Sequence, residues 1–400
     1  MFVESSYTTH GFEQHTQTES RKGAVMTTNR FAAFWRARRA WGALVLTLIL
    51  LAATQSAKAQ WTSADAQTAY SNYNNAFYFN PSGNNYDYRV DQGSTTPTAF
   101  WVAAEEIELA IDAYHENSNS TNENIITQLT NGFVTLHGTN WSSNEYDDDL
   151  MWGTIAFLRA YGVTANSALL TDAETNFNTV YSRGYDTTFG GGIWWQSACE
   201  SGCSGASKNS ASNWTFVIAG VLLYDKTGNS TYLNEANTIY SWAKSNLYNV
   251  STGEVYDNVS VSGKSTSQYS YNYGTAIGAF YWEGDKTDAN LAATYLMEDL
   301  PNYAGTANGY NLLPNYGQGG SDGSGFNGIA LRWTAYAYVN GAISNGSILP
   351  WMQQNVTSAW ALQNSQGLIW NDWVATTPYG GQYSFDCSDA VVGMQDVPVP

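Results

Sequence analysis

Basic residues are scarce in this chain of 400 residues, which has 16 Lys and Arg against 34 Asp and Glu. Seven of the basic and three of the acidic residues fall in positions 1–59, so residues 60–400 carry nine basic and 31 acidic residues, a net charge of −22. Nucleic acids and anionic lipid surfaces are bound by basic patches. We therefore expect no nucleic-acid partner and a neutral ligand.

Histidine is rarer still, with four residues in the whole chain. Beyond residue 59 only His115 and His137 remain, and neither adjoins a pair of acidic residues. Serine–histidine catalysis and histidine-built zinc sites are therefore disfavoured. The sequence also contains no GxxxxGK phosphate loop, dinucleotide fingerprint or CxxC pair. Carboxylate chemistry remains, and we expect no metal and no organic cofactor.

Three cysteines, Cys199, Cys203 and Cys387, are too few to act as the framework of a domain of this size. Cys199 and Cys203 are close enough to form a small disulfide in an oxidising compartment, and they could equally remain unbridged. The core must be hydrophobic.

Long apolar runs are also missing, and the one candidate extends from Trp41 to Ala53. Arginines at 36, 38 and 39 precede it, and Ala57-Lys58-Ala59 follows it. This order is typical of a secretory signal peptide, and about 13 apolar residues are fewer than the roughly 20 that span a bilayer. We expect residues 1–59 to be a signal peptide with a preceding segment, and the mature protein to be exported, without stable membrane insertion.

Aromatic residues, in contrast, are abundant at 15% of the chain, whereas charged residues make up only 12%. Aromatic rings stack on the apolar faces of sugar rings, and neutral polysaccharides are the obvious neutral polymers outside a cell. The composition therefore favours a glycan groove, with an aromatic-rich core as the alternative explanation.

Helical patterns follow one another from about residue 62, separated by loops rich in Gly, Asn, Ser and Asp. The spacing of Ala156, Tyr161 and Ala173 recurs 63 residues later and again after a further 57. A period near 60 built from helix pairs indicates stacked helical hairpins. We predict helices at 62–79, 99–116, 121–136, 147–163, 168–183, 210–227, 230–247, 272–284, 287–299, 325–342, 348–364 and 384–394.

Six such hairpins closing on themselves make an all-α (α/α)6 barrel, in which inner helices alternate with outer ones. An open α-solenoid is the alternative, and the long glycine-rich loops disfavour it. No Pro-rich or Ser-rich linker divides the chain. We therefore expect residues 60–400 to be a single catalytic domain, with its site on the loops where the inner helices begin.

Three consecutive acids stand out in the run Tyr146-Asp147-Asp148-Asp149-Leu150-Met151-Trp152, which opens an amphipathic helix. Acids in a first helical turn complement the helix dipole, and a calcium site is another explanation. Stabilisation of the helix end does not by itself explain three consecutive carboxylates, because their like charges repel one another. A retaining glycosidase needs two carboxyl groups about 5–5.5 Å apart, and mutual repulsion keeps one of them protonated.

The run resembles the signature of glycoside hydrolase family 76, in which Tyr-Asp-Asp is followed by Trp four residues after the second Asp. That family comprises endo-α-1,6-mannanases and related fungal wall enzymes. Further stretches resemble it in the same order from residue 62 to 395: Phe100-Trp101 with Glu108 and Ile111-Asp112, Gly191-Gly192-Ile193-Trp194-Trp195, Lys208-Asn209 with Asn213, Gly253-Glu254-Val255-Tyr256-Asp257, Tyr271-Asn272-Tyr273-Gly274, and Asp322 with Phe326-Asn327-Gly328 and Arg332. The resemblance implies the (α/α)6 barrel independently.

By this resemblance Asp147 is the nucleophile and Asp148 the general acid/base, while Asp149 is a helix-turn residue that raises the pKa of Asp148. The resemblance also implies substrate contacts by Trp101, Tyr146, Trp152, Trp194, Trp195, Asn209, Asn213, Asp257, Tyr271, Asn272, Tyr273, Asp322, Phe326 and Arg332. Trp194 and Trp195 could instead plug the barrel end, and Asn209 and Asn213 could be turn formers. Asn327, Tyr273 and Met151 depart from the family pattern, which affects subsite preference.

The resemblance implies a retaining hydrolase that cleaves internal α-1,6 bonds of α-mannan. We expect the exported protein to be a monomer. A transglycosidase acting on α-mannan or on mannose-containing anchor glycans would share the same covalent intermediate. A non-catalytic glycan-binding protein could use the same fold. A lyase or an unsaturated-uronide hydrolase is a further alternative, but its anionic substrate suits an acidic protein poorly.

Overall fold

The structure is a computed structural model that describes residues 60–81, 86–198, 203 and 205–400. These residues lie in the compact unit Lys58–Pro400. The expected signal peptide, residues 1–59, lies outside the described residues, as does Cys199. Cys203 is a free and exposed cysteine, and its pairing with Cys199 stays a prediction. None of the helices in the described part of the chain has the length and apolar character needed to cross a bilayer.

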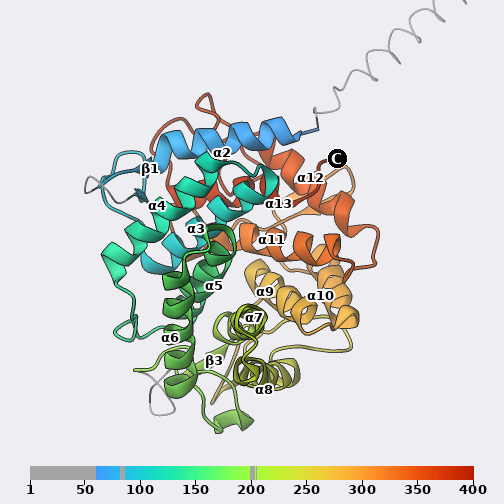
Figure 1. The fold of residues 1–400 in the computed structure, drawn as a ribbon. Helices are drawn as coiled ribbons and strands as arrows, with labels where there is room; N and C mark the ends of the chain where they lie inside the picture. The colour runs from blue at the N-terminus through green and yellow to red at the C-terminus, as the bar shows by residue number, and fades with distance from the viewer. Residues whose placement is uncertain (1–59, 82–85, 199–202, 204) are drawn as a thin grey trace, which may run out of the picture. The chain divides into compact units, whose positions relative to one another are not determined.

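Twelve α-helices in the described residues alternate between an inner and an outer position (Figure 1). The inner helices are α3 (Phe100–Glu116), α5 (Asp147–Thr164), α7 (Ser210–Thr227), α9 (Ser270–Trp282), α11 (Phe326–Val339) and α13 (Ser384–Asp396). The outer helices are α2 (Ser63–Phe77), α4 (Ser120–His137), α6 (Ser167–Gly184), α8 (Ser230–Asn246), α10 (Lys286–Glu298) and α12 (Ile348–Trp360). Each predicted helix has its counterpart among them.

The inner helices form a closed ring. Each packs against the next, from α3 on α5 through to α11 on α13, and α13 returns to pack on α3. The protein is therefore an (α/α)6 barrel, as expected, and the open solenoid is excluded because the first and last inner helices touch.

Burial explains which helices lie inside. Every residue of α7 from Ser210 to Leu223 is buried, so the helix has no solvent-facing stripe. Its outer partner α8 buries only one face, made of Tyr232, Ala236, Ile239, Trp242 and Ala243. A helix that is apolar or small all round belongs in a core, whereas an amphipathic helix covers one.

The repeated alanines lie where inner and outer helices meet. Ala156, Ala219 and Ala276 of the inner helices are fully buried, and so are Ala173, Ala236 and Ala293 of their outer partners. A methyl group at these positions lets each helix pair approach closely, which explains the period in the sequence.

Short antiparallel strands and two 3₁₀ turns complete the loops. The strand pairs are β1 (Tyr78–Phe79) with β2 (Asp87–Tyr88), β3 (Ser207–Asn209) with β4 (Asn258–Ser260), β4 with β5 (Gly263–Lys264), and β6 (Gly305–Ala307) with β7 (Tyr310–Leu312). The 3₁₀ turns are η1 (Thr188–Gly190) and η2 (Asp322–Gly325). The β3–β4 pair matters for function, because it joins the loops that precede α7 and α9 and sets Asn209 opposite Asn258.

Candidate active site

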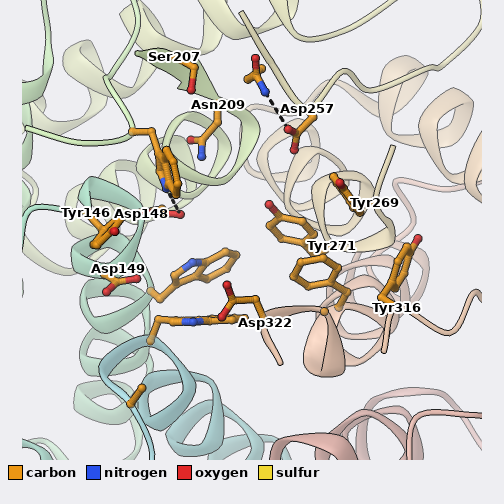
Figure 2. Close-up of a pocket in the computed structure, with 17 residues that line it drawn as sticks. Tyr146, Asp148, Asp149, Ser207, Asn209, Asp257, Tyr269, Tyr271, Tyr316 and Asp322 are labelled. Atoms are coloured by element: carbon orange, nitrogen blue, oxygen red, sulfur yellow. Dashed lines mark hydrogen bonds between the residues drawn. The ribbon is translucent and has the colours of Figure 1, made fainter. Parts of the chain in front are cut away.

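A pocket of about 690 Å³ opens at the end of the barrel where the inner helices begin, which is the location that we expected (Figure 2). Residues at or before the first turns of α3, α5, α7, α9 and α11 all contribute to it. Its lining comprises Ala99, Trp101, Tyr146, Asp148, Asp149, Trp152, Trp195, Ser207, Asn209, Asp257, Asn258, Tyr269, Tyr271, Tyr316, Asp322, Gly323 and Phe326.

Aromatic rings form one continuous wall of the pocket. The ring centroids of Trp101 and Trp152 lie 6.3 Å apart, and Trp152 lies 6.5 Å from Tyr271. Tyr271 in turn stacks on Phe326 at 4.0 Å. Extended aromatic surfaces of this kind offer apolar faces with polar edges, which suits the flat side of a sugar ring.

Asp148 and Asp149, on the first turn of α5, provide two carboxyl groups to the pocket. The indole N–H of Trp195 donates a hydrogen bond of 3.1 Å to Oδ2 of Asp148. The side-chain amide of Asn144 donates one of 2.8 Å to Oδ2 of Asp149. Figure 2 shows both acids on the side of the pocket opposite Asp257 and Tyr271. Each acid therefore has its own fixed donor.

The two acids hold protons with different strengths. Burial, together with the charges of Asp149 and Asp147, raises the pKa of Asp148 well above its usual range, although the Trp195 donor opposes the shift. Burial raises the pKa of Asp149 to about 6, with the Asn144 amide lowering it and the charge of Asp322 raising it. A carboxylic acid beside a carboxylate is the pairing that glycoside hydrolysis requires near neutral pH.

A polar wall faces these acids. Asp257 accepts hydrogen bonds of 2.9 Å from the amides of Asn272 and Asn258, one on each carboxyl oxygen. Burial raises the pKa of Asp257, against the effect of these two donors. The β3–β4 register brings Asn209 and Ser207 to the same side of the pocket. The pocket thus combines hydrogen-bonding groups with aromatic faces, and its lining contains no Lys, Arg or His.

The family model for glycosyl hydrolase family 76 matches residues 60–395 of this chain. The chain belongs to glycosyl hydrolase family 76. The mannan endo-1,6-alpha-mannosidase DCW1 of Saccharomyces cerevisiae is 29% identical over 238 residues, which cover 55% of this chain and 52% of that protein. The chain spans about a third to two thirds of the length of the curated relatives that it matches.

Solved structures of family 76 proteins share the barrel. The GH76A alpha-1,6-mannanase from Salegentibacter sp. HEL1_6 matches with a TM-score of 0.73 and 24% identity, over 84% of this chain and 98% of that one. An inactive variant of that enzyme, with two adjacent aspartates replaced, was solved in complex with alpha-1,6-mannotriose and matches with a TM-score of 0.72, 23% identity and the same coverage of both chains.

Sixteen side chains were predicted to bind substrate or to react, and ten of them line the pocket. They are Trp101, Tyr146, Asp148, Trp152, Trp195, Asn209, Asp257, Tyr271, Asp322 and Phe326. The other six lie off its lining, and they are Asp147, Trp194, Asn213, Asn272, Tyr273 and Arg332.

Asp147, the predicted nucleophile, is one of these six. Its side chain is fully buried, and Oδ1 accepts a 2.7 Å hydrogen bond from Nε of Arg183 on α6. Successive residues of a helix project about 100° apart, so three consecutive side chains cannot all face one pocket. The rotation of α5 directs Asp148 and Asp149 into the pocket and Asp147 into the protein. Of the predicted pair, Asp148 therefore lies on the pocket lining, next to Asp149, whereas Asp147 does not.

Trp194, Asn213 and Tyr273 support the walls of the pocket from behind. Trp194 is 1% exposed and packs under Lys208, whose Nζ lies 4.8 Å from the ring centroid. This position fits the alternative in which Trp194 fills the end of the barrel. Asn213 bonds to both the N–H and the carbonyl of Ile193, which fixes the glycine–tryptophan loop. Tyr273 is buried and donates to Gln268 at 2.7 Å. Asn272, likewise buried, donates a hydrogen bond to Asp257, which lines the pocket.

Arg332 was predicted to bind substrate, but the structure places its side chain away from the pocket lining. The side chain is 2% exposed and lies in the barrel core, where it bonds to Glu105 at 2.5 Å and Asp112 at 2.7 Å on α3. Burial alone would raise the pKa of Asp112, but the adjacent Arg332 and Arg159 lower it below its usual value. The charge of Arg332 is neutralised by these acids and is not offered to the pocket.

Several lining residues lie outside the predicted set, above all Asp149, for which the resemblance implies the role of a helix-turn residue. Tyr269 lies two positions before Tyr271, and Tyr316 lies six positions before Asp322. Their closeness in sequence to these predicted residues was the only feature that could have indicated them. Ser207 and Asn258 reach the pocket through the β3–β4 pairing, which no local pattern indicates. No cluster of three or more His, Cys, Asp or Glu suited to a metal ion occurs within the described ranges.

Proposed function

We propose that this protein is a retaining glycoside hydrolase that cleaves internal α-1,6-mannosidic bonds, with Asp149 as nucleophile and Asp148 as general acid/base. The observation that carries the proposal is the presence of these two neighbouring acids, with unlike pKa values, in an aromatic-lined pocket of about 690 Å³. The role of Asp148 remains the one that the family resemblance implied. In the proposed mechanism Asp149 takes the place of Asp147 as nucleophile, because Asp149 lines the pocket and Asp147 does not.

The proposed reaction has two steps. Asp149 attacks the anomeric carbon while Asp148 gives its proton to the leaving glycosidic oxygen, and the bond between that carbon and oxygen breaks. This leaves a glycosyl ester on Asp149. Asp148, now a carboxylate, takes a proton from water as the water attacks the same carbon and releases Asp149. Two inversions give net retention.

Support for retention comes from the placement of the acids on consecutive residues. Consecutive Cα atoms are 3.8 Å apart, so the two carboxyl groups can adopt the short separation of about 5–5.5 Å that retaining enzymes use. Inverting enzymes hold their carboxyl groups about 6.5–9.5 Å apart to admit a water molecule.

Support for a mannan substrate comes from the relatives and from charge. DCW1 is named for mannan endo-1,6-alpha-mannosidase activity, and the Salegentibacter variant holds alpha-1,6-mannotriose. That variant is inactive and lacks two adjacent aspartates. The four lining carboxyl groups, Asp148, Asp149, Asp257 and Asp322, face no lining cation, which favours a neutral glycan over an anionic one.

We further propose that the protein acts outside the cell, on the basis of the signal-like segment before residue 60.

The test is incubation with debranched α-1,6-mannan, with products separated by size and the anomeric configuration of new reducing ends followed by NMR. We expect internal cleavage with α-configured products. Asp148→Asn should lower kcat by about 10²–10⁴-fold, the usual contribution of general acid–base catalysis. Asp149→Asn should abolish turnover. New β-configured ends, or full activity in both variants, would refute the mechanism.

Labelling separates Asp149 from Asp147 directly. A fluorinated mannosyl donor with a good leaving group should leave an ester on Asp149, identified by mass spectrometry of peptides. An ester on Asp147 would restore the role that the sequence predicted. Adding sugar acceptors to the same assay separates hydrolysis from transglycosylation, and tight mannan binding without new reducing ends would indicate a non-catalytic binding protein.

A further inference from the structure

The last turn of outer helix α6 lies beside the loop that precedes α5, and Arg183 connects the two. Its guanidinium donates three hydrogen bonds: Nε to Oδ1 of Asp147 at 2.7 Å, one terminal nitrogen to the carbonyl of Ser142 at 2.9 Å, and the other to the carbonyl of Asn144 at 2.8 Å. The Arg183 side chain is 18% exposed and that of Asp147 is fully buried. A charge-assisted contact so shielded from water has a fixed geometry.

One branch of this cluster leads to Asp149. Arg183 holds the carbonyl of Asn144, and the side chain of the same Asn144 donates to Oδ2 of Asp149 at 2.8 Å. The side-chain oxygen of Asn144 also accepts from the N–H of Tyr146, so the residue is held at three points. The position of the Asn144 amide, and with it the orientation of Asp149, depends on Arg183.

A second branch leads to Asp148. The backbone N–H of Asp147 donates to the carbonyl of Trp195 at 2.8 Å, and the indole of Trp195 donates to Asp148. Trp195 also donates its own backbone N–H to Ser207 at 2.9 Å. Asp147 therefore links the ion pair with Arg183 to the tryptophan that contacts the second acid.

Gly184 leaves the space that this arrangement requires. A Cβ atom at position 184 would lie 2.6 Å from Oδ2 of Asp147 and 3.0 Å from a side-chain carbon of Ile193. The residue that follows Arg183 must be small for the Asp147 carboxylate to stay in place.

We propose that Arg183 and Asp147 are positioning residues that set the rotation of the first turn of α5 and the placement of Asn144 and Trp195, so that Asp148 and Asp149 point into the pocket. The inference rests on the proposed function. It assigns Asp147 a purpose other than chemistry, since its carboxylate binds Arg183 and its N–H binds the Trp195 loop. Neither residue lines the pocket.

The test compares Arg183→Gln, Arg183→Lys and Gly184→Ala with the wild type by steady-state kinetics on α-1,6-mannan, with folding checked by circular dichroism. We expect Arg183→Gln to lower kcat about 10²-fold, as misplacement by about 1 Å can, with little change in KM because the aromatic wall is intact. Arg183→Lys should recover part of kcat, since an ammonium keeps the ion pair but lacks the planar fork that serves three acceptors. Gly184→Ala should lower kcat without removing any charge.

The pH profile gives a readout that loss of stability would not change. The groups that face Asp149 are Asn144 in the loop before α5, Asp148 in the same turn of α5, and Asp322 of η2. Release of the Asn144 donor in Arg183→Gln should raise the pKa of Asp149 and move the acidic limb of kcat/KM to higher pH. Arg183→Lys should move it back towards the wild type.

A matched control is Lys226→Gln, which removes a cation from an exposed ion pair with Asp225 in the last turn of α7. This variant should keep wild-type kcat and pH profile. The inference is overturned if folded Arg183→Gln and Gly184→Ala keep wild-type kcat and pH profile and only melt earlier, while Asp148→Asn and Asp149→Asn are inactive. Activity in the two Asp variants would instead refute the proposed function. Should Arg183→Gln fail to fold, Arg183→Lys and Gly184→Ala decide the question.

Discussion

The first turn of α5 holds three carboxyl groups in three different environments. Asp147 is paired with Arg183, Asp148 is bound to the Trp195 indole, and Asp149 is bound to the Asn144 amide. All three lie at the positive end of a helix dipole, which stabilises their charged forms. The differences among them arise from their side-chain partners and burial.

At this residue scale, the pKa of Asp149, about 6, predicts the acidic limb of the pH profile. Asp149 must be a carboxylate to attack, so kcat/KM should fall about tenfold per pH unit below about pH 6. Asp322→Asn removes a charge that raises this pKa, so the limb should move to lower pH. Kinetics across pH 4–8 on both proteins check the prediction, and an unmoved limb would contradict it.

Among the helices, α9 and α11 approach each other closely at Gly274. A Cβ atom at Gly274 would lie 2.7 Å from both the Cα of Ala330 and the carbonyl oxygen of Ile329. Both are backbone atoms, so only a shift of a whole helix can relieve the clash. Because α9 carries Tyr271 and α11 carries Phe326, this contact also sets the aromatic stack in the pocket.

We therefore expect Gly274→Ala to lower the free energy of unfolding by about 1–3 kcal/mol, the usual cost of overpacking. Gly162→Ala, near the end of α5, is the matched control because no atom lies within 4 Å of the added Cβ. It should be neutral or stabilising by up to about 1 kcal/mol, since alanine favours a helix. Urea denaturation measures both, and equal stability of the two variants would contradict the prediction.

Across the whole molecule, a buried ion network connects inner helices that are far apart in sequence. Arg332 on α11 and Arg159 on α5 both bind Asp112 on α3, each at 2.5–2.7 Å, and both also contact Glu108. Glu105 completes the set, and burial raises its pKa to about 7 even though Arg332 opposes the shift. The network joins three sides of the ring at its centre.

Arg332→Met should lower the free energy of unfolding by about 3–5 kcal/mol, because it leaves buried carboxylates without their cation. Arg332→Lys should be intermediate, since one ammonium cannot replace two nitrogens that bond to Glu105 and Asp112 in different directions. Thermal unfolding gives the order. The KM of folded Arg332→Lys should equal that of the wild type, and a large rise in KM would return Arg332 to the substrate site.

Much of this protein follows from local sequence. Inner helices such as α7 are apolar or small on every side, whereas outer helices such as α8 are apolar on one side, so the order of the helices was predictable from periodicity. The closed barrel, and the end that carries the site, followed from the repeated helix pairs together with the glycine-rich loops and the family resemblance. The acid run and the aromatic motifs predicted most of the pocket lining, because they lie at the starts of inner helices.

Tertiary structure decided which of these side chains face the pocket. Helical periodicity spaces Asp147, Asp148 and Asp149 about 100° apart but leaves the absolute rotation of α5 free. Contacts from α6 and the Trp195 loop set that rotation, and they come from 36 and 48 residues away. Arg332 likewise met its acids across 220 residues. Partners at such separations leave no local pattern, so the chain by itself specified the barrel and its acids, while packing determined which two of the acids face the pocket.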